Sequence, residues 1–163
     1  ELRSKDYRAC DPGELRILNR LQPGMSLGTY QVTTDPTKQF QRYDSNVISD
    51  PLDWYRLTSP WGEPVTAPCT VIEYLWGYAM QGLGPFVGDS VGLFGAIEIG
   101  FHHGPFLVNC DYRLESKVLC VGQSPQTEYV WYETEAFNSA NQRVATMLMQ
   151  SRVMKASSRE YAS

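Results

Sequence analysis

The amino-acid sequence predicts an α+β fold in which a curled antiparallel sheet wraps around one long central helix. The first observation is the segment 70–81, whose apolar residues fall on every side of a helix, and a helix of this kind is buried all round. The second is the change after residue 91 to apolar residues with period two, which is typical of β-strands. The strands would cover most of the helix, and a second subunit or a loop would cover the rest.

The residues before this helix predict an arm, a strand and a second helix. Residues 1–26 are expected to be an N-terminal arm, a short helical stretch or lead-in, and residues 27–163 a single domain. The β-forming residues 28–34 predict a strand. Asp35-Pro36 predicts a helix start, because aspartate caps helices and proline suits the first turn. The helix should end before Pro51, since the residue before a proline avoids the helical conformation.

About four strands are predicted after the central helix. The segments 91–104 and 127–137 are rich in β-forming residues, and 105–125 is either one long or bent strand or two. The last segment, 144–155, is ambiguous, because its composition favours a helix whereas its apolar residues alternate as in a strand. We predict a strand, since the segments before it are strands joined by short turns.

Composition and charge exclude several classes of protein. The chain has 163 residues, which suits one domain with one core. Its net charge is −4 and no Lys/Arg cluster is present, so we expect no nucleic-acid or membrane partner. No apolar run is long enough to span a membrane, and the first residues do not resemble a signal peptide. The four cysteines lack metal-ligand spacing, which favours reduced thiols of a cytoplasmic protein with no metal or cofactor.

An unusual loop precedes the central helix. Residues 49–68, SDPLDWYRLTSPWGEPVTAP, contain four prolines, two tryptophans and two aspartates. Prolines lower the entropy cost of holding a loop in one conformation. Tryptophans supply flat apolar surface. We therefore expect this loop to form a rigid wall of a pocket at the start of the helix.

Three stretches of the chain resemble MaoC-like acyl dehydratases, which have the hot-dog fold: residues 33–76, 96–137 and 143–157. In that family a helix leads to an Asp-x-Asn-Pro-x-His type motif, whose Asp and His handle the proton and the water as water is added or removed next to a thioester. The resemblance also implies that a backbone N–H at the start of the central helix polarises the thioester carbonyl. Here that donor would lie in 68–71, where Pro68 has no N–H.

The Asp/His pair of the family is not in register in this chain. If Asp50-Pro51 takes the Asn-Pro place, Ile48 stands at the Asp position and Asp53 at the His position. We therefore expect Asp50 or Asp53 to be the acid–base group, with a pKa raised by the aromatic residues nearby. The structural alternative is a turn, because Asp before Pro favours turns and helix caps.

Two further residues are candidate proton-handling groups. Glu73 is the only acid in the apolar helix, on which hot-dog thioesterases place a catalytic carboxylate; the alternative is a partly exposed side chain or a pair with an arginine such as Arg113. His102 and His103 are the only histidines, and neighbours on a strand face opposite sides, so at most one faces a pocket. We predict His102 as a catalytic residue, and the alternative is a histidine at the surface or the sheet edge. The expected substrate-binding residues are Trp54, Tyr55, Trp61, Cys69, Thr70 and Trp76.

The resemblance implies a dehydratase or hydratase of an acyl thioester, carried by CoA or a carrier protein, or of a similar activated carbonyl substrate. Two alternatives stay open. One is an isomerase or cyclase of specialised metabolism, with a small-molecule substrate shaped by the aromatic pocket. The other is a non-catalytic hot-dog subunit that pairs with an active partner. We also expect a homodimer, because a single curled sheet leaves an open edge strand that invites pairing.

Overall fold

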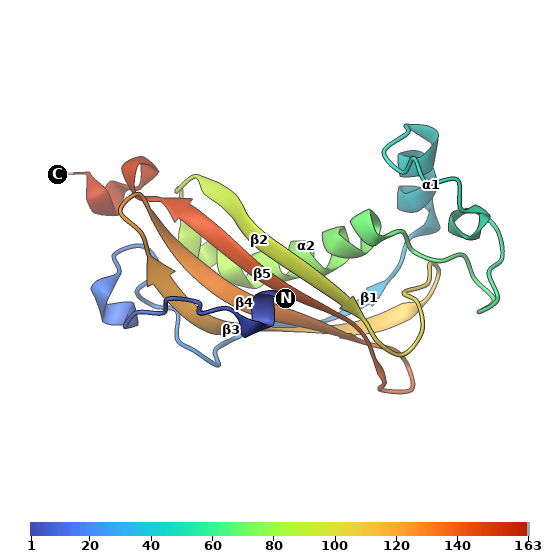
Figure 1. The fold of residues 1–163 in the computed structure, drawn as a ribbon, viewed down its shortest axis with the longest axis horizontal. Coiled ribbons are helices and arrows are strands. Elements are labelled where there is room, and N and C mark those ends of the chain that lie inside the picture. The colour runs from blue at the N-terminus through green and yellow to red at the C-terminus, as the bar shows by residue number, and fades with distance from the viewer. Residues whose placement is uncertain (163) are drawn as a thin grey trace.

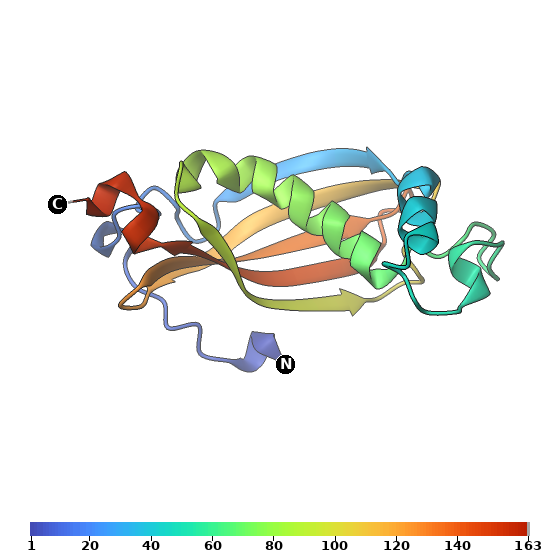
Figure 2. The ribbon, with the colours of Figure 1, turned by 90° about the horizontal axis from the view of Figure 1, so that it is seen from above.

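The computed structural model describes residues 1–162 as one antiparallel sheet with a long helix on one face (Figures 1 and 2). The sheet has five strands in the order β1-β3-β4-β5-β2. The helices and strands are β1 Ser26–Thr33, α1 Pro36–Asp44, α2 Pro68–Val87, β2 Gly92–Phe101, β3 Asp111–Gln123, β4 Thr127–Phe137 and β5 Arg143–Met154. This is the hot-dog arrangement that the sequence predicts, and the fold prediction is confirmed. The sheet is open and does not close into a barrel.

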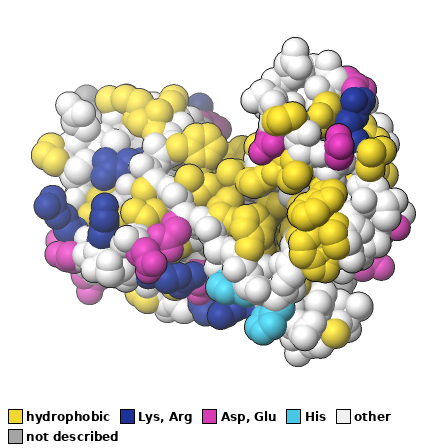
Figure 3. Space-filling model, turned by 45° about the vertical axis from the view of Figure 1, so that its right-hand side comes forward, with side chains coloured by type: hydrophobic (Ala, Val, Ile, Leu, Met, Phe, Trp, Pro, Cys, Tyr) yellow, Lys and Arg dark blue, Asp and Glu magenta, His cyan; other side chains and the backbone are white. Residues whose placement is uncertain are grey.

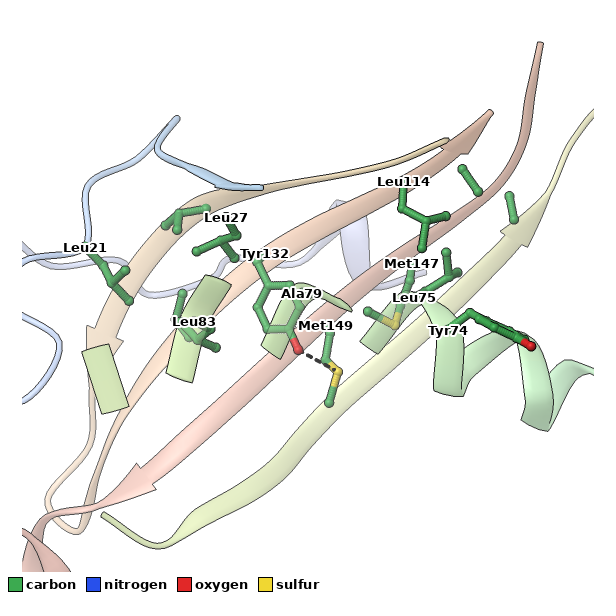
Figure 4. Packing of buried hydrophobic residues seen from close by; sticks show 14 of the residues in the cluster. Leu21, Leu27, Tyr74, Leu75, Ala79, Leu83, Leu114, Tyr132, Met147 and Met149 are labelled. Carbon is green, nitrogen blue, oxygen red and sulfur yellow. Dashed lines mark hydrogen bonds between the residues drawn. The ribbon is translucent and has the colours of Figure 1, made fainter. Parts of the chain in front are cut away.

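The core lies between α2 and the face of the sheet that it covers (Figure 4). Leu75, Ala79 and Leu83 of α2 are fully buried, and they face residues of β4 and β5. Tyr132 of β4 donates a hydrogen bond to the sulfur of Met149, 3.1 Å away, so its hydroxyl is satisfied inside this apolar layer. Burial of these side chains is the main stabilising term, at about 1.5–3 kcal/mol for each large one.

Helix α2 extends further than the sequence indicates. We predicted an end near Gln81, because Gly82, Gly84 and Pro85 are helix-breaking residues, but the helix continues to Val87. Gly82 has a packing role, since a Cβ atom there would lie 1.7 Å from the carbonyl oxygen of Leu27 in β1. The glycine therefore allows helix and strand to approach closely.

The remaining elements follow the prediction with shifted boundaries. Helix α1 begins as expected, with the Asp35 carboxylate accepting a hydrogen bond from the Thr37 N–H. It ends at Asp44, earlier than expected. The segment 105–125 gives a loop and then one strand, β3, which carries a bulge between Val118 and Cys120. The ambiguous last segment is strand β5, which lies between β4 and β2.

The N-terminal arm contributes to the core. Residues 1–25 form two 3₁₀ turns, Leu2–Ser4 and Pro12–Glu14, rather than an α-helix. Side chains later in the arm, such as Leu18 and Leu21, are fully buried in the main core. On the other face of the sheet, the ring of Tyr7 stacks on Trp131 of β4 at 4.6 Å. The arm thus packs against both faces of the sheet.

A buried carboxylate fastens the arm to the sheet. Glu128 of β4 has no exposed surface, and it accepts hydrogen bonds from the backbone N–H groups of residues 16–18. The phenol of Tyr161, in the C-terminal 3₁₀ turn, donates another at 2.6 Å. Burial alone raises the pKa of Glu128, but these hydrogen bonds outweigh burial and lower it. One side chain therefore joins both ends of the chain to β4.

Strand β2 forms an edge of the sheet with exposed apolar side chains. Phe94, Ile97 and Phe101 are 70%, 41% and 46% exposed, although they lie on the same face as α2. Phe94 packs against Trp76 of α2, with the ring centres 5.4 Å apart. The side of α2 that faces β2 is therefore only partly covered.

None of the helices in residues 1–162 combines the length and the apolar character needed to cross a membrane.

Candidate active site

The loop between α1 and α2 is held by one buried glutamine. Gln39 of α1 is fully buried, and its side-chain NH₂ donates to the carbonyl oxygens of Tyr55 and Val65, each 2.7 Å away. Its side-chain oxygen accepts the N–H of Ala67 at 2.8 Å. These three bonds fix the loop directly before α2, in addition to the stiffness that the prolines give it.

The first turn of α2 leaves one backbone donor free. Ala67 caps the helix, and its carbonyl oxygen accepts the N–H groups of Thr70 and Val71. Pro68 has no N–H to donate. Within residues 1–162 the N–H of Cys69 has no hydrogen-bond acceptor. The positive end of the helix dipole therefore carries an available donor, which suits a developing negative charge.

A groove of about 310 Å³ opens beside this turn. Figure 3 shows apolar side chains around a hollow below the protruding part of the molecule, with the two histidines along its lower border. The groove is lined by Tyr55, Trp61, Val65, Thr66, Pro68, Phe101, His102, Gly104, Pro105 and Phe106. The structure thus brings the loop, the start of α2 and the end of β2 to one place. Among the predicted site residues it places Tyr55, Trp61 and His102 there.

Asp50 lies near Tyr55, which lines this groove. Burial raises the pKa of the Tyr55 phenol, and the negative charge of Asp50 raises it further. The phenol therefore stays protonated at neutral pH and is able to donate a hydrogen bond. The Asp50 carboxylate accepts the Leu52 N–H at 3.0 Å through one oxygen, which leaves the second oxygen open. This turn is the structural alternative that the sequence offered, and it is compatible with an acid–base role.

His102 lies at the rim, but its imidazole bonds away from α2. Its Nε2 lies 3.0 Å from the hydroxyl of Thr146. Thr146 alternates along β5 with Ala145 and Met147 of the core, so its side chain lies on the opposite face of the sheet. Burial lowers the pKa of His102, and the charge of Arg143 lowers it further. The imidazole is therefore mostly neutral at pH 7.

Glu73 has different partners from the one suggested by the sequence. Its carboxylate pairs with Arg42 and, at 3.8 Å, with Lys38, both on α1. Arg113 instead pairs with Glu115 on its own strand. The side chain of Glu73 is 37% exposed, so it is neither deeply buried nor unpaired. This ion pair links the first turns of α2 to α1.

The other predicted site residues lie beside the groove or away from it. Asp53 and Trp54 are exposed in the loop, and Trp54 meets Trp61 edge-to-face at 5.6 Å. Thr70 is buried beneath Cys69 in the first turn of α2. Trp76 lies two turns further along α2, against the start of β2. Among residues 1–162, no cluster of His, Cys, Asp and Glu side chains has the arrangement of a metal site.

Sequence reasoning missed three residues. Thr66 lines the groove, and its buried hydroxyl has no hydrogen-bond partner among the described residues. Gln39, which orders the loop, belongs to no sequence motif that would have marked it. Asp44 ends α1, and Asp44-Ser45-Asn46 matches the Asp-x-Asn part of the dehydratase motif, with Ser49 at the His position. In this structure the Asp44 carboxylate is exposed and accepts a hydrogen bond from Arg56 at 2.7 Å.

The fold and the groove together define a hot-dog protein with a candidate site at the start of its central helix. No protein-family model matches the chain, and no curated protein matches its sequence. Solved structures do match its fold. A monoamine oxidase regulatory protein from Archaeoglobus is 16% identical, with a TM-score of 0.69 over 85% of this chain and 94% of that one.

Two other solved structures have names that state an activity. A MaoC-like dehydratase from Rhodospirillum rubrum is 14% identical, with a TM-score of 0.61 over 85% of this chain and 96% of that one. The HadBC complex of Mycobacterium tuberculosis, a 3R-hydroxyacyl-ACP dehydratase, gives 14% identity and a TM-score of 0.63 over 81% of this chain and 96% of that one. At these identities the similarity establishes the hot-dog fold, and the function requires its own argument.

Proposed function

We propose that the chain is a hydratase or dehydratase of acyl thioesters. The observation that carries the proposal is the free N–H of Cys69 in the first turn of α2, directly after Pro68, which lines a groove with aromatic walls. Such a donor stabilises the negative charge that forms on a thioester oxygen during this reaction. The dehydratases of the same fold add support to this choice of reaction.

In the hydration direction, the Asp50 carboxylate removes a proton from water, and the water oxygen bonds to C3 of a 2-enoyl thioester. The electron pair of the C2–C3 double bond moves to the thioester oxygen, where the Cys69 N–H stabilises it. The enolate then collapses, and C2 takes the proton from Asp50. Tyr55 donates a hydrogen bond that positions the water. Dehydration follows the same steps in reverse.

The proposal is tested by incubating the purified chain with 2-enoyl CoA thioesters of increasing acyl length. We expect loss of the enoyl absorbance and formation of the 3-hydroxyacyl thioester. Failure to convert any thioester of the series, in either direction, would contradict the proposal. The same assay with a free polycyclic or other non-thioester substrate distinguishes an isomerase or cyclase.

Trp61 is expected to hold the substrate without taking part in the chemistry. Trp61 is 52% exposed at the edge of the groove, so substrate binding would bury it. Trp61→Ala should raise KM about tenfold with little change in kcat, because the lost apolar contact affects ground state and transition state alike. Trp61→Phe, which keeps a flat ring, is the matched control. A loss in kcat alone would contradict this role.

We further propose that the chain forms a homodimer through the free edge of β2. A second copy would pair with the unpaired backbone of this strand and cover Phe94, Ile97 and Phe101, as the exposed apolar face requires. A two-fold axis would make the two β2 strands antiparallel. Light scattering at micromolar concentration should therefore give the mass of a dimer.

Ile97→Asp should convert this dimer to a monomer, because it places a charge within the apolar contact. Leu57→Asp, at an exposed loop position away from β2, should leave the mass unchanged. A wild-type mass that is strictly monomeric, or a dimer that Ile97→Asp does not weaken, would refute the β2 interface.

The orientation of His102 favours a second candidate, a hot-dog subunit without activity of its own. The imidazole of His102 bonds to Thr146, on the opposite face of the sheet from α2, so this residue does not present a histidine base to the first turn of α2. Such a subunit would copurify with an active partner from its source cells. A chain that is inactive alone and active only in that mixture would support this candidate.

A further inference from the structure

A second groove, at the opposite end of α2, carries positive charge that the proposed chemistry does not use. It has a volume of about 470 Å³. It lies where the N-terminal arm and the C-terminal turns meet the end of α2 (Figure 2). Its walls include Arg16, Arg20, Arg159, Asn19, Ser90 and Ser158, together with Asp89 and Glu160.

The side chains of Arg16 and Arg20 are held in place but are not neutralised. Arg16 lies over the ring of Tyr161 at 4.9 Å and donates to the carbonyl oxygen of Glu160. Arg20 lies over the ring of Phe86 at 5.1 Å and donates to the carbonyl oxygen of Pro85 at 2.9 Å. Each guanidinium has five N–H donors, so each keeps several free. Their positions are fixed before any ligand binds, which lowers the entropy cost of binding.

Among residues 1–162, Arg16 and Arg20 lack acidic partners, which is unusual because the chain as a whole is acidic. The sequence has 18 acidic and 14 basic side chains. Arg3, Arg42, Arg56, Arg113 and Arg143 all pair with carboxylates. Among residues 1–162 neither Arg16 nor Arg20 has such a partner, and Arg159 reaches Asp89 only at 3.8 Å with both side chains exposed.

We propose that this groove binds the phosphate groups of a nucleotide-type ligand, in the first instance the phosphate-bearing end of CoA. Arginine donors match phosphate oxygens in pairs, and a guanidinium that lies on an aromatic ring offers its other face to a flat base. The anion site follows from the groove alone. Its assignment to CoA rests on the proposed thioester chemistry.

The proposed dimer explains how this groove serves the candidate active site. Helix α2 has 20 residues, so its two ends are about 30 Å apart and the two grooves of one chain are separate. Strand β2 begins beside Val87, at the arginine groove, and ends at Phe101, at the active-site groove. Antiparallel pairing of two β2 strands brings the arginine groove of one copy to the same end as the active-site groove of the other.

Binding is tested by calorimetry of the intact chain with CoA, adenosine 3′,5′-bisphosphate and inorganic pyrophosphate. We expect saturable binding that weakens as salt is added, and about tenfold weaker binding for each of Arg16→Gln and Arg20→Gln. Arg8→Gln removes an exposed arginine outside the groove, and it should change nothing. Thermal melts show whether each variant is folded. Tighter binding of CoA and the bisphosphate than of pyrophosphate identifies a nucleotide rather than free phosphate.

Absence of saturable binding, or binding that the folded double variant Arg16→Gln/Arg20→Gln retains in full, would overturn the anion site. Binding of CoA without any hydration would leave the anion site standing and remove the proposed function. If the chain hydrates CoA thioesters and the double variant has the same KM as the wild type, the proposed function would stand and the assignment of this groove to CoA would fall.

Mixed dimers test whether the groove acts across the interface. In a dimer of one Asp50→Asn chain and one Arg16→Gln/Arg20→Gln chain, one active site combines an intact Asp50 with the intact arginines of its partner. Mixing the two variants should therefore restore activity at low CoA thioester concentration to well above that of either alone. Activity equal to the average of the two variants would show that the groove does not serve the partner's site.

Discussion

Replacing Asp50 by asparagine is expected to lower the turnover of the thioester reaction about a hundredfold or more, the usual effect of losing a general acid–base group. The amide keeps the size of the side chain and an oxygen that accepts the Leu52 N–H, so the turn and the fold should remain. Steady-state kinetics with a 2-enoyl thioester measure the rate, and a thermal melt confirms the fold.

Other acidic residues supply the controls for this experiment. Asp53→Asn and Asp44→Asn remove the same charge from neighbouring positions, and we expect both to retain most of the activity. A loss in either one, with Asp50→Asn active, would move the acid–base role to that residue. If all three variants stay active while Glu73→Gln or His102→Ala abolishes activity, the loop only covers the site and the chemistry belongs to the helix and the sheet.

Glu128→Gln is expected to destabilise the protein by about 3 to 5 kcal/mol at pH 7, the largest effect on stability that we predict. The carboxylate is fully buried and accepts hydrogen bonds from residues 16–18 and from Tyr161. An amide has one acceptor oxygen, and its NH₂ group would face donors that are left unpaired. Urea unfolding measures the change, and Glu160→Gln, an exposed acid in the adjoining turn, is the matched control.

The contribution of Glu128 should also depend on pH. Its pKa is lowered in the folded state, so its stabilisation is complete above the ordinary carboxyl pKa of about 4.3 and is lost as pH falls through the folded value. The difference in unfolding free energy between wild type and Glu128→Gln should therefore shrink on acidification through that range. A difference that stays constant with pH would show that the carboxylate charge is not responsible.

The sequence allowed the fold to be predicted because each main element has a local pattern. The alternation of Ala145, Met147 and Met149 in β5 outweighed a composition that favours a helix, since the strand must place one face on the core. The end of α2 could not be predicted. Gly82 has the appearance of a helix stop, and only the position of β1 in space shows that its missing side chain makes room for a neighbouring backbone.

The candidate site was predicted only in part. Loop composition pointed to the start of α2, where the structure has a groove lined by Tyr55 and Trp61. The partners of each side chain could not be predicted, because they come from distant parts of the sequence. Arg42 lies 31 positions from Glu73, and Thr146 lies 44 positions from His102. No local pattern specifies such contacts.

The close contact at Gly82 fixes the tilt of α2 relative to the sheet near the C-terminal end of the helix. At about 1.5 Å per residue, Pro68 lies about 21 Å along the helix from Gly82. Any side chain at position 82 must push the helix away from Leu27, and a tilt of about 5° there would move the first turn by about 2 Å. A displacement of even about 1 Å at a reacting centre is enough to lower a rate severely. The distance between helix and sheet at one end of the molecule thus sets the alignment of the Cys69 N–H at the other.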